Sequence, residues 1–107
     1  MAWVLEQFTQ GTSNPVAEFL ATLTTDNRAK VAALLKQLAE HGNKLKMPKS
    51  KALGKNLYEL RTRTGVRIFY TFRPGRRAVL LGGIEKKRDD IPAEMLLLMR
   101  ARLAAIP

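Results

Sequence analysis

Arginine and lysine side chains that could hold a phosphate recur in the C-terminal half of this 107-residue chain. Arg61 and Arg67 lie in segments of alternating residue type, and Lys86 and Lys87 follow a third such segment. The planar guanidinium of arginine stays charged and can bind phosphate through two hydrogen bonds. A lysine crowded by other cations can instead have a lowered pKa. Paired as a sheet, these segments would have one apolar face packed on helices and one cationic face suited to phosphate contact.

The basic charge is concentrated in the middle of the chain. Of nineteen Lys and Arg residues, fourteen fall between His41 and Arg88, a stretch that contains only two acids, Glu59 and Glu85. Such a field attracts a polyanion, most simply a nucleic-acid backbone. The chain has no cysteine, which excludes disulfides and thiolate metal sites. With a single histidine as well, we expect neither a metal centre nor a cofactor.

Hydrophobic periodicity predicts one α+β domain over residues 1–107 with the element order β-α-α-β-β-β-α. A short strand is expected over residues 3–8, ahead of two helices that form a hairpin. Asn14 is the expected cap of the first helix, residues 24–26 supply the next cap, and Gly42 ends the second helix. No run reaches the roughly 18 apolar residues that span a bilayer, so we expect a soluble, cytoplasmic protein.

Residues 43–56 are lysine-rich and are predicted to be a loop. Three strands are expected after it, over residues 57–63, 66–72 and 76–84, with a turn between each pair. Asp90 is the expected cap of a last helix that has Pro92 in its first turn. The predicted architecture is therefore an N-terminal helical hairpin packed on a twisted, mainly antiparallel sheet, with a C-terminal helix.

The C-terminal half carries an ordered set of short motifs. Residues 57–61 read LYELR, residues 65–70 read GVRIFY, residues 79–87 read VLLGGIEKK, and Ile91-Pro92 precedes the last helix. In this order they resemble the HigB-like, phage-derived branch of the RelE/ParE toxin superfamily. The resemblance implies a single RelE-like domain and a toxin of a type II toxin–antitoxin pair, which cuts mRNA in the ribosomal A site.

The resemblance also implies partners. They would be a cognate antitoxin, often with a helix-turn-helix domain, and the 30S A site with its mRNA. Operator DNA would be bound only through the antitoxin, and no membrane contact is expected. The cationic residues of the family would correspond to Arg61, Arg67, Lys86 and Lys87, with Glu59 or Tyr58 as further contributors.

Metal-independent RNA cleavage uses the 2′-hydroxyl as nucleophile and needs a base, charge to stabilise the phosphorane, and an acid. Arg61 and Arg67 suit charge stabilisation, and Lys86 or Lys87 can exchange a proton. Glu59 is a candidate base, or alternatively the partner of a cation in a structural ion pair on the sheet surface. Further cations are expected to hold RNA outside the reaction centre, namely Lys44, Lys46, Lys49, Lys51, Lys55, Arg63, Arg73 and Arg88.

Two departures from the family pattern leave the acid and the base open. Gly83-Ile84-Glu85 replaces the Gly-Phe that usually precedes the lysine pair, and no His or Tyr near the last helix matches the family's proton-transferring residue. One alternative is a ParE-like inhibitor of DNA gyrase with no nuclease site. Another is a non-catalytic nucleic-acid-binding module, which is weakened because Phe69 is the only clear aromatic on the Arg67 face.

Overall fold

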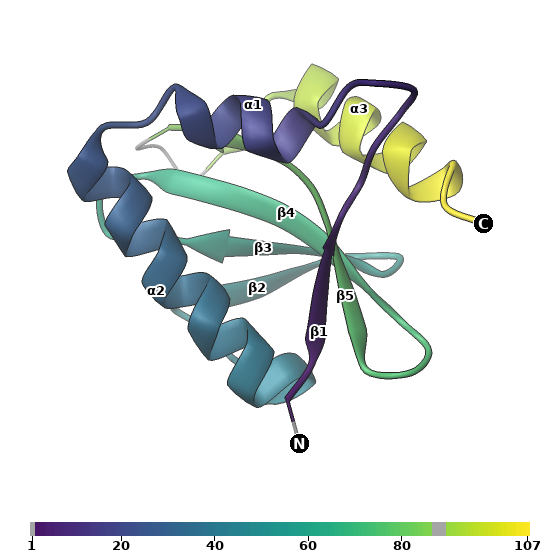
Figure 1. Cartoon of the computed structure of the whole chain (residues 1–107), viewed down its shortest axis with the longest axis horizontal. Coiled ribbons are helices and arrows are strands. Elements are labelled where there is room, and N and C mark those ends of the chain that lie inside the picture. Colours follow the sequence, from purple (N-terminus) through teal and green to yellow (C-terminus); the bar gives the residue numbers. More distant parts are fainter. Residues whose placement is uncertain (1, 87–89) are drawn as a thin grey trace.

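The sheet is the framework on which the rest of the molecule is built (Figure 1). The computed structural model describes residues 2–86 and 90–107. Five strands lie in the order β1-β5-β4-β3-β2, namely β1 (Val4–Gln7), β2 (Ser50–Gly54), β3 (Leu57–Arg61), β4 (Val66–Arg73) and β5 (Arg77–Glu85). β1 pairs with β5 in parallel, and all other pairings are antiparallel. The predicted α+β class with a mainly antiparallel sheet is confirmed.

Local sequence signals begin and end the N-terminal helices. α1 (Pro15–Ala21) follows Asn14, and α2 (Thr25–His41) follows Thr24; each cap side chain accepts a hydrogen bond from an N–H of the first turn. Gly42, at a φ of 54°, ends α2 in a conformation that other residues rarely adopt. These caps are the predicted ones, and a short 3-10 turn, η1 (Gly42–Lys44), follows.

The segment predicted as a loop contains a strand. β2 pairs with β3 so that Lys51 lies opposite Glu59, and the element order is therefore β-α-α-β-β-β-β-α. The prediction of an unbroken loop over residues 43–56 is wrong. β2 is an edge strand whose exposed lysine and adjacent Ala52 and Leu53 give no alternation of apolar and polar residues.

Both faces of the sheet pack against helices. On one face, Leu60, Ile68 and Tyr70 form a core with buried residues of α2 such as Val31 and Leu38. The opposite face carries a second core, in which Met99 of α3 (Ala93–Ala104) meets residues of three strands, Leu57, Phe69 and Leu81. The expectation of one apolar and one cationic face is therefore wrong, because the second face also carries an apolar core, which the C-terminal helix partly covers.

Two consecutive glycines in β5 let the helices approach both faces. Neighbouring residues of a strand point to opposite sides of the sheet. A Cβ on Gly83 would lie 2.5 Å from the ring of Phe19 in α1, and a Cβ on Gly82 would lie 2.6 Å from the guanidinium of Arg102 in α3. The Arg102 guanidinium also donates a hydrogen bond of 2.9 Å to the carbonyl of Leu81. The glycines thus fix the close packing of α1 and α3 on β5.

The last helix begins two positions later than the expected cap implies. Pro92 occupies the N-cap position and makes no side-chain capping bond, so the prediction that Asp90 caps α3 is wrong. Asp90 instead lies with its carboxylate 3.8 Å from the ammonium of Lys86. None of the helices in the described ranges is long and apolar enough to cross a membrane.

Candidate functional site

The sheet register brings three of the predicted site residues together. Arg61 of β3 pairs with Arg67 of β4, and the next rung pairs Glu59 with Phe69. Because alternate residues share a face, the side chains of Glu59, Arg61 and Arg67 all lie on the α3 side of the sheet. Nη1 of Arg67 is 3.5 Å from Oε2 of Glu59, and Nε of Arg61 is 3.7 Å from Oε1. These residues form the Glu59–Arg61–Arg67 cluster.

The cluster is mostly buried. Glu59 and Arg67 are each 1% exposed, whereas the side chain of Arg61 is 24% exposed. The prediction that Arg67 lies on a solvated or binding surface is therefore wrong in this structure. The prediction that Glu59 forms its ion pair on the sheet surface is wrong as well. Phe69 is completely buried as well, so it offers no face on which a base could stack.

Burial raises the pKa of the Glu59 carboxyl above its ordinary value. The positive charges of Arg67, Arg61 and Lys51 act in the opposite direction and offset part of this effect. Oε2 of Glu59 faces the Arg67 guanidinium at 3.5 Å, which is longer than an ordinary charge-assisted hydrogen bond. A carboxyl held between two guanidinium groups, with a raised pKa, is suited to accept a proton.

Lys86 lies at the same end of the sheet as the cluster. Ile84 of β5 is the rung partner of Arg67, and the backbone N–H of Lys86 donates a 2.7 Å hydrogen bond to the carbonyl of Gly65. Its ammonium lies near Asp90, a pairing that the four-residue spacing of the two positions could have indicated. The predicted site residues Lys87 and Arg88 lie outside the described residues.

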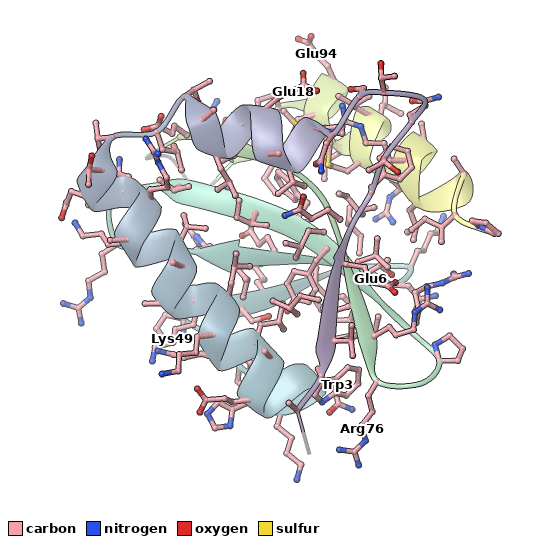
Figure 2. All side chains as sticks on the ribbon, in the orientation of Figure 1. Trp3, Glu6, Glu18, Lys49, Arg76 and Glu94 are labelled. Atoms are coloured by element: carbon pink, nitrogen blue, oxygen red, sulfur yellow. The ribbon has the colours of Figure 1, made fainter. Side chains whose placement is uncertain are left out.

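The other predicted RNA-binding residues are spread over the molecule. Lys51 faces Glu59 across the β2–β3 pair, which sequence reasoning missed because it placed this lysine in a loop. Arg73 lies at the far end of β4 and donates a hydrogen bond to the carbonyl of Pro107. The remaining described ones, Lys44, Lys46, Lys49, Lys55 and Arg63, are exposed and follow α2 or lie in the turns beside β3. Lys49, which directly precedes β2, is labelled in Figure 2.

No group of three or more metal-ligating side chains is found within residues 2–86 and 90–107. The chemistry available in the described part of the cluster is therefore that of one carboxyl and several cations. Such a set can bind an anionic group at the exposed edge of Arg61 and accept a proton at Glu59.

The fold is that of the RelE-like toxins. It matches a chain in the crystal structure of the toxin–antitoxin complex RelBE2 from Mycobacterium tuberculosis with a TM-score of 0.60. The two sequences are 16% identical, and the match covers 80% of this chain and 100% of that chain. At this identity, the similarity shows the fold.

The family follows from the sequence itself. The profile of the phage derived protein Gp49-like family (DUF891) matches residues 18–104, and the chain belongs to that family. A comparison with curated proteins finds no match. Fold and family together confirm the broader part of the resemblance, namely a RelE-like fold in a chain of a phage-derived family.

Proposed function

We propose that this chain is the toxin of a type II toxin–antitoxin pair of the HigB type and acts in the cytoplasm as a ribosome-dependent mRNA endoribonuclease. The RelE-like fold, a structural neighbour from a toxin–antitoxin complex and the phage-derived family all support a toxin. The observation that carries the nuclease proposal is the Glu59–Arg61–Arg67 cluster. It places a carboxyl of raised pKa beside two fixed cations on one face of the sheet.

In the proposed reaction, Glu59 takes the proton of the 2′-hydroxyl, and the resulting oxygen attacks the adjacent phosphorus. The bond to the 5′-oxygen breaks, which leaves a 2′,3′-cyclic phosphate and a 5′-hydroxyl. Arg61 and Arg67 stabilise the negative charge of the phosphorane, because guanidinium stays protonated throughout. Lys86 or Lys87 gives a proton to the leaving 5′-oxygen.

The burial of Glu59 and Arg67 adds a condition to this mechanism. RNA can contact Arg61 directly, whereas the other two side chains are reached only after the groups that cover them move aside. Catalytic contacts often form only in the substrate complex. Docking on the ribosome would supply the binding energy that uncovers Glu59 and Arg67. The exposed lysines after α2 would bind RNA away from the cluster, and Lys51 and Arg63 would bind it close to the cluster. The cognate antitoxin would prevent that docking.

The same burial favours a second candidate function. If the Glu59–Arg67 ion pair serves only to stabilise the sheet, the chain would be a ParE-like inhibitor of DNA gyrase without a nuclease site. The fold serves both functions and cannot decide between them. The third candidate, a non-catalytic nucleic-acid-binding module that stacks bases on this face, loses its support because Phe69 is buried.

Brief expression in cells separates these functions. We would map the 5′ ends of mRNA and follow the DNA-damage response in the same culture, with Lys36→Ala as the control for a neutralised exposed cation. Cuts at a fixed position within codons support the ribonuclease. Damage signalling with intact mRNA supports gyrase inhibition and contradicts the proposal. Intact mRNA without damage signalling contradicts both.

A further inference from the structure

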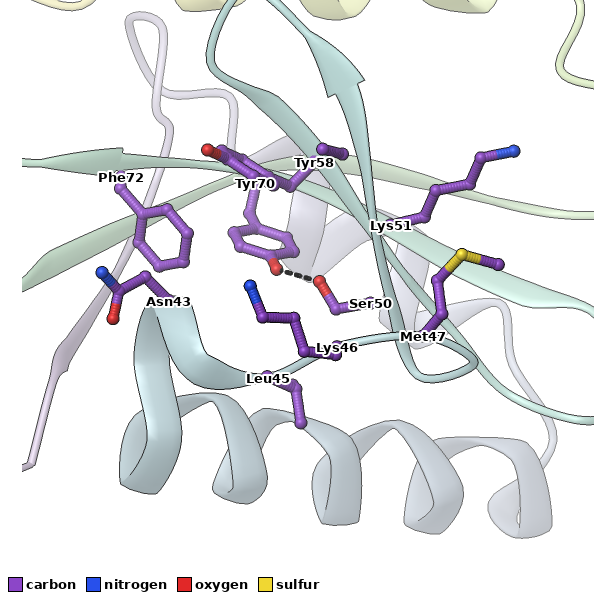
Figure 3. Close-up of a pocket in the computed structure, with 10 residues that line it drawn as sticks. Asn43, Leu45, Lys46, Met47, Ser50, Lys51, Tyr58, Tyr70 and Phe72 are labelled. Carbon is purple, nitrogen blue, oxygen red and sulfur yellow. Dashed lines mark hydrogen bonds between the residues drawn. The ribbon is translucent and has the colours of Figure 1, made fainter.

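A cavity of about 330 Å³ lies on the face of the sheet opposite the Glu59–Arg61–Arg67 cluster (Figure 3). Ser50, Tyr58 and Tyr70 line it from β2, β3 and β4, and the segment after α2 contributes Asn43 and Lys46. The register pairs Tyr58 with Tyr70, one position away from the Glu59 rung, so these tyrosines and the cluster occupy opposite faces. The proposed cleavage reaction does not use this cavity.

Aromatic rings form one wall of the cavity. The rings of Tyr58 and Tyr70 stack with centroids 5.5 Å apart and planes inclined by 24°. Phe72 stands edge-on to both, at 5.0 Å from Tyr58 and 5.4 Å from Tyr70. Tyr70 is buried and its hydroxyl lies 2.5 Å from Oγ of Ser50, whereas Tyr58 and Phe72 are partly exposed. Three rings therefore line the cavity: Tyr70 is held in place by burial and by its contact with Ser50, and Tyr58 and Phe72 are the two that remain partly exposed.

Polar groups stand in front of this wall. Figure 3 shows the ammonium of Lys46 extending toward the Tyr70–Ser50 hydrogen bond and the amide of Asn43 beside Phe72. Lys46 and Asn43 are exposed, so neither is held by burial in the core. An amide can donate and accept hydrogen bonds, and an ammonium can hold a phosphate. Partly exposed rings, an amide and a cation are the groups that bind an unstacked nucleotide.

A second cavity, of about 480 Å³, lies beside the first and shares a lining residue with it. Asn43 lines both, and Trp3, Lys44 and Arg76 line the second. Trp3 packs on Phe72 with ring centroids 5.0 Å apart, so an aromatic contact joins the two cavities. Figure 2 shows Trp3 and Arg76 close to each other near the start of β1. Lys44 and Arg76 therefore place two cations beside the aromatic wall, and Glu40 adds one carboxylate to the same lining.

We propose that the first cavity binds one unstacked nucleotide of single-stranded RNA. Its base lies against Tyr58 and Phe72, Asn43 contacts the base edge, and Lys46 holds a phosphate. The adjoining phosphate lies in the second cavity, where it contacts Lys44. This inference rests on RNA being the substrate class of the proposed function. It assigns a binding subsite that is separate from the cleavage cluster, so each can fail without the other.

The direct test uses a fluorescently labelled, fully 2′-O-methylated RNA hexamer, which cannot be cleaved through its 2′-oxygens. Binding is followed by fluorescence anisotropy at fixed salt, because phosphate contacts depend strongly on ionic strength. We expect Lys46→Ala and Tyr58→Leu each to weaken binding by at least about fivefold, in line with the loss of a stacked base or a phosphate contact. Lys36→Ala removes the same charge from α2, outside both cavities, and should change affinity by less than about twofold.

Equal losses of RNA affinity in Lys36→Ala and Lys46→Ala would overturn the subsite, because the net positive charge of the protein would then explain the binding. Undiminished binding by both cavity variants would overturn it too. If Tyr58→Leu does not fold, Asn43→Ala takes its place, with the same expected weakening. A cleavage assay on the same variants is not needed, so failure of the nuclease proposal leaves this result readable.

Photo-crosslinking on ribosomes identifies the source of the nucleotide. RNA that carries 4-thiouridine is irradiated with the wild-type protein, and the crosslinked peptides are mapped. A crosslink to residues 43–46, Tyr58 or Phe72 supports the subsite, and the RNA attached shows whether mRNA or ribosomal RNA occupies it. No RNA crosslink there, together with shielding of the cavity by the antitoxin alone, would identify a protein-docking site and overturn the proposal.

Discussion

Glu59 and Arg67 form a buried ion pair between diagonal positions of β3 and β4. The guanidinium Nη1 lies 3.5 Å from the carboxylate Oε2, and each side chain is 1% exposed. Burying one charge without its partner is costly, so the two residues depend on each other in the folded state. The same pair is the centre of the proposed cleavage site. Tests of catalysis must therefore be separated from tests of folding.

Arg67→Ala should destabilise the fold far more than Arg61→Ala. The first change leaves the Glu59 carboxyl buried without its main partner, which costs about 3–5 kcal/mol. Arg61 is partly exposed and its ion pair with Glu59 is longer, so its loss should cost about 1 kcal/mol or less. Urea denaturation of the two variants measures both values. Equal losses of unfolding free energy would contradict the buried-pair interpretation.

The rate of RNA cleavage should depend on the protonation of Glu59. Burial raises the pKa of this carboxyl above 4.5, and a general base works only when deprotonated. Cleavage should therefore increase with pH through a midpoint above 4.5 in the wild type. Glu59→Gln should cleave RNA much more slowly, and its cleavage rate should not show this increase with pH. A single-turnover pH profile that is the same in both proteins would exclude Glu59 as the base.

Tyr70→Phe should change how stability depends on alkaline pH. Burial raises the pKa of Tyr70 above 10, so the folded state retains a proton that the unfolded state releases. The stability due to the neutral phenol is fully present below the unfolded pKa and is lost as pH rises through the folded pKa. Tyr70→Phe should remove this alkaline loss and cost about 1–3 kcal/mol at neutral pH, because Ser50 loses its partner.

Urea denaturation between about pH 8 and about pH 11 tests this expectation, with the wild type as reference because other groups titrate in both proteins. A constant difference in unfolding free energy across the range would show that the Tyr70 phenol does not contribute to the alkaline dependence.

Gly83→Ala should destabilise the fold more than Gly82→Ala. At Gly83 the new Cβ would meet the Phe19 ring at 2.5 Å and the backbone carbonyl oxygen of Arg67 at 2.8 Å. Backbone cannot move aside cheaply, so a cost of about 1–3 kcal/mol is expected. At Gly82 the nearest atoms belong to the flexible ends of Arg102 and Met99. Thermal unfolding of both variants compares the effects, and a larger loss for Gly82→Ala would refute the packing argument.

Local signals were enough to predict most of the fold. Asn14, Thr24 and Gly42 mark the helix ends through their own side-chain or backbone chemistry, and the structure uses all three. β2 could not be predicted because its partner supplies the pairing, and its own residues do not alternate. An edge strand of this kind is defined by tertiary contact with β3, which a single-sequence pattern does not encode.

The alternation of β4 predicted which side chains share a face but not what covers that face. The apolar stripe of α3 could pack on either side of the sheet, and the spacing of its residues does not show that it covers Phe69 or that Arg67 is buried on the same face. Glu59, one rung away, forms an ion pair with Arg67 and so offsets part of the cost of burying its charge. Arg73 shares the alternation of Arg67 but lies six residues further along β4, about 20 Å away. Arg73 donates a hydrogen bond to the carbonyl of Pro107, and residue spacing along β4 cannot predict a contact of this kind.

Cleavage by the purified protein on ribosomes is the decisive measurement of ribosome-dependent nuclease activity. Ribosomes with a defined mRNA in the A site are mixed with the wild type, Arg61→Ala or Lys36→Ala, after denaturation has shown that all three are folded. Arg61 is the clearest choice because it belongs to the cluster but is not fully buried. We expect a cut in the A-site codon by the wild type and Lys36→Ala, with a 2′,3′-cyclic phosphate at the new end, and at least about a hundredfold slower cutting by Arg61→Ala. Intact mRNA with the wild type, or equal rates for all three proteins, would contradict this expectation.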